Sequence, residues 1–249
     1  MSVRTSLEGG ICEIVVERPP VNALDVAGWF ALADALRGAG DDPAVRAVVL
    51  RAEGRGFNAG VDIKEIQAKG HEALVGANRG CYAAFAAVYE CKVPVVAAVH
   101  GYCLGGGIGL CGNADIIVAS RDATFALPEV DRGALGAATH LARLVPQHRM
   151  RAMVYTGATA TAEDLQRFGS VLEVVERAEL RATALRVAGE IAKKSPTVIR
   201  AAKECLNGID PVDPRPSYRF EQGFTFELNL TGVSDEARAA FVEKREPKR

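Results

Sequence analysis

Apolar residues recur along this chain with two different periods. Short runs rich in valine, isoleucine and alanine predict buried strands, and longer segments with apolar residues every three or four positions predict amphipathic helices. Strands and helices therefore alternate, as in proteins of the α/β class. The predicted strands are residues 11–16, 47–50, 95–99, 116–119, 124–125 and 171–175, and the predicted helices are residues 26–36, 72–90, 133–144 and two within 179–207.

Local signals place the ends of several elements. Asp25 is a suitable N-cap for the first helix, and Pro196 separates the two late helices. Residues 210–216 contain three prolines and form a hinge before a helical tail. We therefore expect a core of residues 1–195 and a C-terminal helical region of residues 196–249.

The tail carries more aromatic surface than one terminal helix normally needs. Aromatic residues are enriched at interfaces, so we expect the tail to pack on another subunit of a homo-oligomer. Packing within the chain's own core is the alternative, since buried aromatics are common in both settings. The large apolar residues of the tail are Tyr218, Phe220, Phe224, Phe226, Leu228 and Leu230.

Composition excludes several classes of function. The chain has 249 residues, a formal net charge of -1 and a pI of about 6.5, so no overall field attracts nucleic acid or an anionic membrane. Its six cysteines show neither a C-x-x-C pair nor the spacing of a zinc site, and we expect reduced thiols and no bound metal. No run reaches roughly 18 apolar residues, which predicts a cytoplasmic protein without a membrane span.

Two glycine-rich loops follow predicted strands, one at residues 51–62 and one at residues 101–112. The second loop contains G-x-G-x-x-G, a pattern of dinucleotide-binding loops. However, only about ten residues separate Gly112 from Asp122, whereas the acid of such a site follows about 20 residues on, after a crossover helix and a second strand. The spacing therefore excludes a dinucleotide site.

Together the loops have the features of an oxyanion hole. Each combines flexible backbone with a rigid strand and a helix N-terminus, so each can direct one free backbone N–H at the same carbonyl oxygen. Taken singly, either loop is better explained as a tight turn.

Residues 57–65 (FNAGVDIKE) and 100–107 (HGYCLGGG) closely resemble the enoyl-CoA hydratase/isomerase, or crotonase, family. The resemblance spans nearly the whole chain and includes residues 18–24 (RPPVNAL), Pro128-Glu129 and residues 241–245 (FVEKR). It implies an α/β (α+β) crotonase-like spiral of ββα turns, with a C-terminal helical region that forms trimers or dimers of trimers. It also implies a substrate that carries coenzyme A, and no permanently bound cofactor.

The resemblance assigns roles to individual residues. The backbone N–H groups of Val61 and Gly106 would polarise a thioester carbonyl and stabilise a thioenolate. Lys64 and Lys244 are implied to contact coenzyme A. Alternatively, both lie on a solvated surface, because most lysines are exposed. The implied coenzyme A contacts are Val21, which would line the adenine pocket, Asp62, Lys64, Phe241 and Lys244.

One position departs from the family's hydratases, which add water with two glutamates. Gly109 stands at the first of these positions, and only the second, Glu129, is present. A single carboxylate can still abstract a proton or activate water. Asp131 is a candidate partner of Glu129, although a structural role in the turn before Gly133 is a slightly better explanation of this residue. His140 lies in an apolar stretch and is better explained as a structural histidine than as a base.

Residues 51–65, 132–140 and 221–230 resemble more closely the family's actinobacterial ring-opening hydrolases, which act on a bicyclic β-keto hydroindanone CoA thioester in cholesterol (steroid) degradation. This implies a hydrolase acting on carbon–carbon bonds in ketonic substances. Glu129, alone or with Asp131, would direct water onto the ring ketone, and retro-Claisen cleavage would leave a thioenolate. Hydration or isomerisation of a bulky enoyl-CoA is one alternative, and non-catalytic acyl-CoA binding is another.

Overall fold

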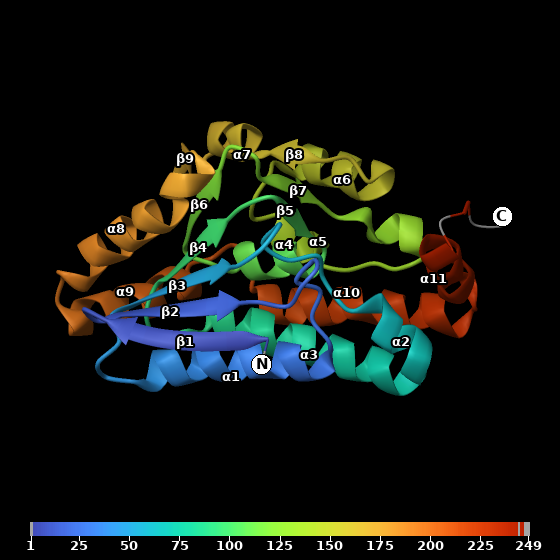
Figure 1. Cartoon of the computed structure of the whole chain (residues 1–249), viewed down its shortest axis with the longest axis horizontal. Helices are drawn as coiled ribbons and strands as arrows, with labels where there is room; N and C mark the ends of the chain where they lie inside the picture. Colours follow the sequence, from blue (N-terminus) through green and yellow to red (C-terminus); the bar gives the residue numbers. More distant parts are fainter. Residues whose placement is uncertain (1, 244, 247–249) are drawn as a thin grey trace.

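A six-stranded sheet forms the centre of the computed structural model, which describes residues 2–243 and 245–246. The first two strands are antiparallel and all other neighbours are parallel. The order is β1 (Val3–Glu8), β2 (Ile11–Val16), β3 (Ala47–Ala52), β4 (Val95–Val99), β6 (Ile116–Ser120) and β9 (Glu173–Val175) (Figure 1). A second sheet joins β5 (Tyr102–Leu104), β7 (Thr124–Ala126) and β8 (Ala160–Thr161).

Helices surround both sheets. The α-helices of the first half are α1 (Val26–Asp41), α2 (Ile63–Lys69), α3 (His71–Tyr89) and α4 (Gly106–Cys111). Those of the second half are α5 (Ala138–Leu141), α6 (Gln147–Thr156), α7 (Ala162–Phe168), α8 (Leu180–Ala192), α9 (Pro196–Gly208), α10 (Pro214–Leu230) and α11 (Val233–Glu243). Two 3₁₀ helices are η1 (Pro128–Arg132) and η2 (Arg177–Glu179).

The chain repeats one structural unit as it proceeds. In β4–β5–α4 and again in β6–β7–η1, it passes through the large sheet, then the small sheet, then a helix. The first glycine loop takes the place of β5 in the preceding turn, because Asn58 forms a parallel bridge with Cys103. The predicted α/β class and ββα spiral are therefore confirmed.

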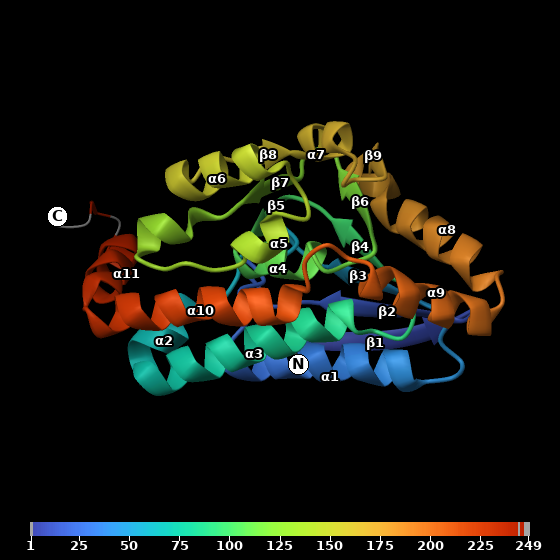
Figure 2. The ribbon, with the colours of Figure 1, turned by 180° about the vertical axis from the view of Figure 1, so that it is seen from behind.

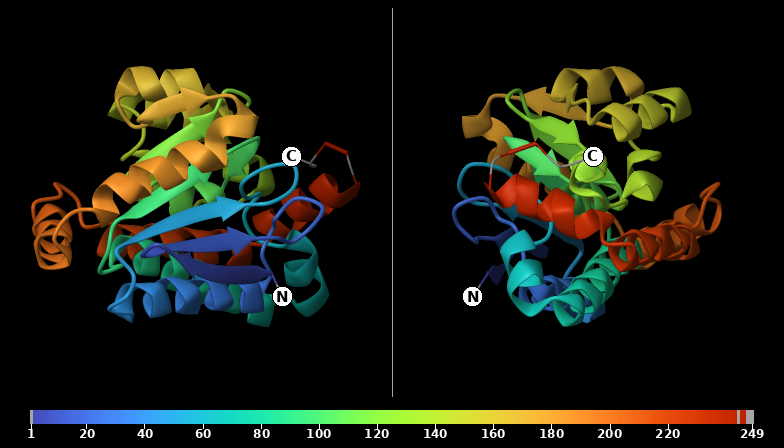
Figure 3. Two further views of the ribbon diagram at one scale, coloured as in Figure 1. Left: turned by 60° about the vertical axis from the view of Figure 1, so that its left-hand side comes forward. Right: turned by 90° about the vertical axis from the view of Figure 1, so that its right-hand side faces the viewer.

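The large sheet is buried on both faces, as parallel sheets usually are. On one face Val48 and Leu50 join the main core with α1 and α3. On the other face Val49 packs with Ala184 and Val187 of α8, which crosses the strands (Figure 3, left). The continuous apolar runs of the sequence follow from this arrangement, since neighbouring residues of a strand face opposite cores.

The predicted helix at residues 133–144 is mostly wrong. Only α5, Ala138–Leu141, is α-helical there, because Gly133 and Ala137 have φ values of 64° and 60°, which a right-handed helix does not allow. The strand β1 was not predicted, since most of it is exposed and carries no apolar alternation. All six cysteines are free and five are buried, as expected.

The tail divides between the two predicted roles. The helix α10 runs along α3 (Figure 2), and Tyr218 is buried in the main core. By contrast, the side chains of Phe220 and Leu230 are exposed, with 74% and 78% of their surface free. Packing within the chain's own core is thus correct for Tyr218. Phe220 and Leu230 instead form an exposed apolar face on α10. No helix in the described ranges is long and apolar enough to cross a membrane.

Candidate active site

The two glycine loops meet in space. Gly60 has a φ of 88°, and a methyl group placed on it would lie 3.3 Å from the backbone nitrogen of Gly106. The carbonyl of Gly60 and the N–H of Asp62 both bond to Leu24. The N–H of Val61 belongs to the same trans peptide unit as the carbonyl of Gly60, so it points the opposite way, away from Leu24. The pairing of the loops expected from the sequence is therefore present.

Neither expected donor is used within the protein. Among the described residues, the N–H groups of Val61 and Gly106 donate no hydrogen bond. Gly106 is the first residue of α4, where backbone N–H groups lack helical partners. Two free amides on adjoining loops are what an oxyanion hole requires.

Buried polar contacts hold the first loop in place. The side chain of Asn58 is completely buried; its Nδ2 donates to the carbonyl of Asn22 (2.6 Å) and its Oδ1 accepts from the N–H of Gly60 (2.8 Å). Because the amide of Gly60 is occupied in this way, only the next amide, that of Val61, stays free.

The second loop rests on Trp29. A methyl group on Gly106 would lie 2.6 Å from the Trp29 ring, so no larger residue fits without displacing that ring. The neighbouring Gly105 has a φ of 54° and donates its N–H to the carbonyl of Ala126 at the end of β7 (3.2 Å). These contacts connect the second loop to the strand that leads into η1.

Glu129 lies on η1 beside the two amides. A methyl group on Gly105 would overlap Glu129 Oε1 and come within 3.9 Å of the Gly60 Cα, so the carboxylate and both loops border one space. Glu129 Oε2 is buried and has no partner among the described residues. Burial raises the pKa of Glu129 to about 8, and the charge of Glu221 adds to this, while its own backbone amide and Arg132 act against it. Glu129 can therefore hold or release a proton near neutral pH.

The structure shows why no carboxylate stands at position 109, where the family's hydratases have one. The ring of Phe85, on α3, occupies the position where any side chain of Gly109 would begin. Phe85 also packs edge-to-face on Trp29, with ring centroids 5.6 Å apart. Its ring therefore excludes a second carboxylate from this helix, and the site contains an apolar wall instead.

Asp131 does not join Glu129. In a 3₁₀ helix residues three apart are eclipsed, so residues two apart point to different sides. Asp131 is exposed, and its carboxylate lies beside Gly157 at the end of α6. The structure thus separates the two acids that the sequence suggested as a pair.

The expected coenzyme A contacts are dispersed around the loops. Val21 is half-buried; Lys64 is exposed in the first turn of α2. Asp62 caps α2 by accepting from the N–H of Lys64 (3.0 Å), and its other oxygen accepts from Arg18 (3.0 Å). The ring of Phe241 stacks on Arg132, 4.3 Å from its guanidinium carbon. Lys244 lies outside the described residues.

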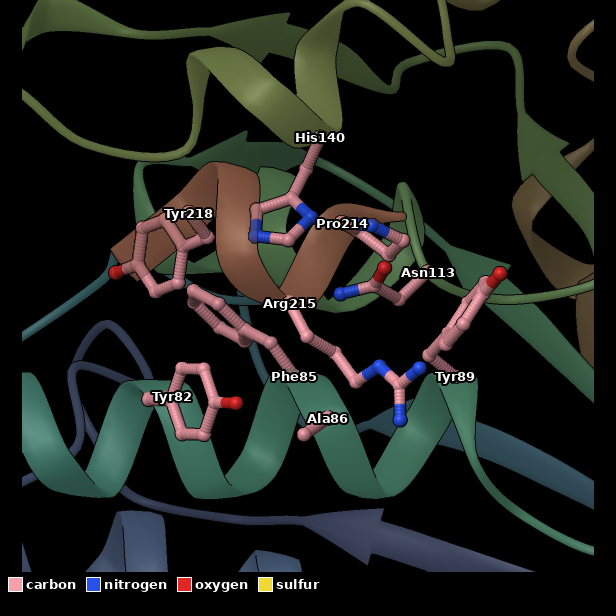
Figure 4. Close-up of a pocket in the computed structure, with 9 residues that line it drawn as sticks. All are labelled: Tyr82, Phe85, Ala86, Tyr89, Asn113, His140, Pro214, Arg215 and Tyr218. Carbon is pink, nitrogen blue, oxygen red and sulfur yellow. The ribbon is translucent and has the colours of Figure 1, made fainter. Parts of the chain in front are cut away.

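His140 is a buried structural residue. Its ring packs on Phe85 and Tyr218 at centroid distances of 5.0 and 4.9 Å, beside a small cavity between α3 and α10 (Figure 4). Burial, and to a smaller extent Arg143, lowers the pKa of His140 to about 3, so the ring is neutral. Neither ring nitrogen has a partner among the described residues. The prediction of a structural histidine is correct.

Sequence reasoning overlooked three residues around the site. Phe85 and Arg132 carry no motif, and only their contacts with Gly109 and Phe241 identify them. Glu221, on α10, is half-buried and accepts from the N–H groups of Ala138 (2.7 Å) and Thr139. No motif marks Glu221; the buried positions of α10 recur every three or four residues, and Glu221 adjoins one of them.

Known proteins resemble this chain over its whole length. The enoyl-CoA hydratase/isomerase family model matches residues 6–248. A Rhodococcus jostii protein named "(7aS)-7a-methyl-1,5-dioxo-2,3,5,6,7,7a-hexahydro-1H-indene-carboxyl-CoA hydrolase" is 64% identical over 100% of this chain and 97% of its own. A Mycobacterium tuberculosis protein of the same name is 65% identical over 96% and 98% of the two chains.

Solved structures agree with the fold. A carnitinyl-CoA hydratase from Mycobacterium avium has a TM-score of 0.86 and 30% identity, and it covers 100% of this chain and 98% of that one. An enoyl-CoA hydratase/isomerase from Pseudoalteromonas atlantica has a TM-score of 0.89 and 27% identity, with 100% of both chains covered.

Proposed function

The chain belongs to the enoyl-CoA hydratase/isomerase family, and on that premise we propose that it hydrolyses a carbon–carbon bond in a bicyclic β-keto acyl-CoA thioester and thereby opens a ring. The two indene-carboxyl-CoA hydrolases support this substrate class by their names and their 64–65% identity. The angular methyl group on fused five- and six-membered rings in that name is the ring pattern of a steroid. Steroid degradation and a cytoplasmic location belong to the same proposal.

One observation carries the choice of chemistry. The site offers a single carboxylate of raised pKa beside two free amides, and Phe85 fills the position from which a second carboxylate would come. Hydration with paired glutamates lacks one of its groups here. Hydrolysis of a β-ketone uses, among other groups, a base for water and an oxyanion hole for the leaving carbanion, and Glu129 and the two free amides are suited to these roles.

The reaction follows from these groups. Glu129 takes a proton from water as the water oxygen bonds to the ring ketone carbon, whose π electrons move onto the ketone oxygen. When that carbonyl re-forms, the bond to the carbon α to the thioester breaks and its electron pair moves onto the thioester oxygen. The N–H groups of Val61 and Gly106 stabilise this thioenolate. Glu129 then returns its proton to the α carbon, and the new carboxylic acid of the ring-opened coenzyme A thioester loses its own proton to solvent to give the carboxylate.

Coenzyme A binding and assembly complete the proposal. Lys64, which has no ion pair among the described residues, supplies local positive charge for phosphate on a chain with no net positive charge. Val21, Asp62, Phe241 and Lys244 are the other proposed contacts, with Asp62 acting by fixing the start of α2. The exposed apolar residues of α9 and α10 suit burial between subunits of a trimer or dimer of trimers.

Product analysis in heavy-oxygen water tests this function. The purified protein, given the 7a-methyl-1,5-dioxo-hexahydroindene-carboxyl-CoA thioester, should form a product one water heavier, with one label in the new carboxylate. Rapid hydration of crotonyl-CoA, without ring opening, would instead identify a hydratase. Tight binding of CoA thioesters without turnover of any would identify a binding protein.

The raised pKa of Glu129 predicts the pH dependence of the reaction. Because Glu129 must be ionised to accept a proton from water, kcat/KM should rise about tenfold per pH unit below pH 8 and level off above it. The charged groups that face Glu129 are Arg132, on η1, and Glu221, on α10. Replacing Glu221 by glutamine removes a repelling charge and should move the midpoint to lower pH. A rate independent of pH between 6 and 8 would contradict the assignment.

A further inference from the structure

Ring opening by the proposed route places negative charge on two separate oxygens. The N–H groups of Val61 and Gly106 border the space for the thioester oxygen. The other charge develops on the ring ketone oxygen when water adds, at the carbon β to the thioester. Two amides that hold one oxygen cannot also hold an oxygen two carbons away. A second group with unused donors is therefore required on the side of the carboxylate that directs the water.

Arg132 lies on that side. It follows Glu129 by three positions in the 3₁₀ helix η1, and side chains at this spacing are eclipsed. The ring of Phe241 holds its guanidinium group from one side, 4.3 Å from the guanidinium carbon. Arg132 thus lies between α11 and the face of η1 that carries the carboxylate.

The hydrogen-bonding capacity of Arg132 is largely unused. Among the described residues one terminal nitrogen donates to the carbonyl of Pro128 at 3.4 Å, and the Nε is buried without a partner. Within those residues it also forms no ion pair. Glu129 Oε2, on the same face, is likewise unpartnered. A buried donor and a buried acceptor without partners are costly unless a ligand uses them.

We propose that Arg132 is a catalytic residue that donates hydrogen bonds to the ring ketone oxygen of the substrate. This inference rests on the proposed ring-opening function. As water bonds to the ketone carbon and its proton moves to Glu129, the developing alkoxide is stabilised by the guanidinium group. When the carbon–carbon bond breaks, the same oxygen and the oxygen from water become the product carboxylate, which a planar guanidinium binds through two hydrogen bonds.

The test compares Arg132→Gln and Arg132→Lys with Arg151→Gln, which makes the same charge change at an exposed arginine of the neighbouring α6. For Arg132→Gln, kcat should fall about 10²- to 10³-fold, as after loss of one oxyanion donor, while KM changes less than about threefold. The affinity for the ring-opened product should fall at least about tenfold, whereas the affinity for free coenzyme A should not change. Arg132→Lys should be intermediate, and Arg151→Gln should behave as the wild type.

The outcomes separate this inference from the proposed function. If the wild-type protein does not open the ring, the proposed function fails. If it does, and Arg132→Gln keeps kcat and product affinity within about threefold of the wild type, the role of Arg132 is refuted. A loss of kcat accompanied by equal losses of coenzyme A affinity and thermal stability would show a structural role and also refute it. Should Arg132→Gln not fold, unchanged kcat and product affinity in Arg132→Lys would refute it.

Discussion

Replacing Glu129 by glutamine should slow ring opening severely and at the same time make the fold more stable above about pH 5. The carboxylate of Glu129 borders the space between Gly60 and Gly105, and glutamine cannot take a proton from water. Loss of a general acid–base residue lowers rates by about 10²- to 10⁴-fold. The expected kcat for the labelled-water reaction is therefore about 10²- to 10⁴-fold below that of the wild type.

The stability gain follows from the raised pKa of Glu129. In the unfolded chain this carboxyl ionises at its ordinary value near 4.5, whereas in the folded chain burial raises its pKa to about 8. Between these values the folded chain retains a proton that the unfolded chain has lost, so wild-type stability falls as pH rises, by up to about 1.4 kcal/mol per pH unit. Glutamine has no such dependence, and its advantage should grow from pH 4.5 to pH 8 and then level off.

Thermal unfolding of both proteins between pH 5 and pH 9 measures this difference. Glu204→Gln, a change at an exposed glutamate of α9, is the matched control and should alter neither rate nor stability. Full ring-opening activity in a folded Glu129→Gln protein would remove Glu129 from the mechanism. A stability difference that does not vary with pH would show that the carboxyl titrates normally.

Gly109→Ala should destabilise the protein strongly, although the same exchange in most helices is favourable. Any Cβ at this position overlaps the Phe85 ring, which is itself held by Trp29 and Tyr218. Overpacking of this kind costs about 1–3 kcal/mol, and sometimes more. For a domain of this size each kcal/mol lowers Tm by about 2–4 °C. Gly109→Glu, which restores the hydratase residue, should be worse still, because it also brings a charge against the ring.

Two further variants show whether the contact with Phe85 is the cause. Gly189→Ala, at a glycine in α8 with open space around it, should raise stability by about 0.5–1 kcal/mol through helix propensity. Phe85→Leu should relieve part of the cost of Gly109→Ala, so the double mutant should be more stable than the sum of the single changes. Equal effects of alanine at Gly109 and Gly189 would contradict this explanation.

Much of the site could be predicted from local pattern. The apolar runs predicted the main strands. The two glycine loops that follow strands predicted paired amides, because glycine lets the backbone adopt the conformations that such a loop needs. Glu129, and the glycine at position 109 where the family's hydratases have a glutamate, were identified through the family resemblance. The helix at residues 133–144 failed for a local reason too, since two left-handed residues there carry no strong sequence signal.

The sequence by itself, through its resemblance to a known family, predicted the ββα spiral, the two amide donors and the single carboxylate. Only the tertiary structure decided what fills the position beside Gly109, which way Asp131 points and what lies next to Glu129. Phe85 and Gly109 are far apart in sequence, as are Arg132 and Phe241, and their contacts exist only once α3 and α11 have packed. The raised pKa of Glu129 has the same origin, because desolvation depends on every element around a group and not on its neighbours in the chain.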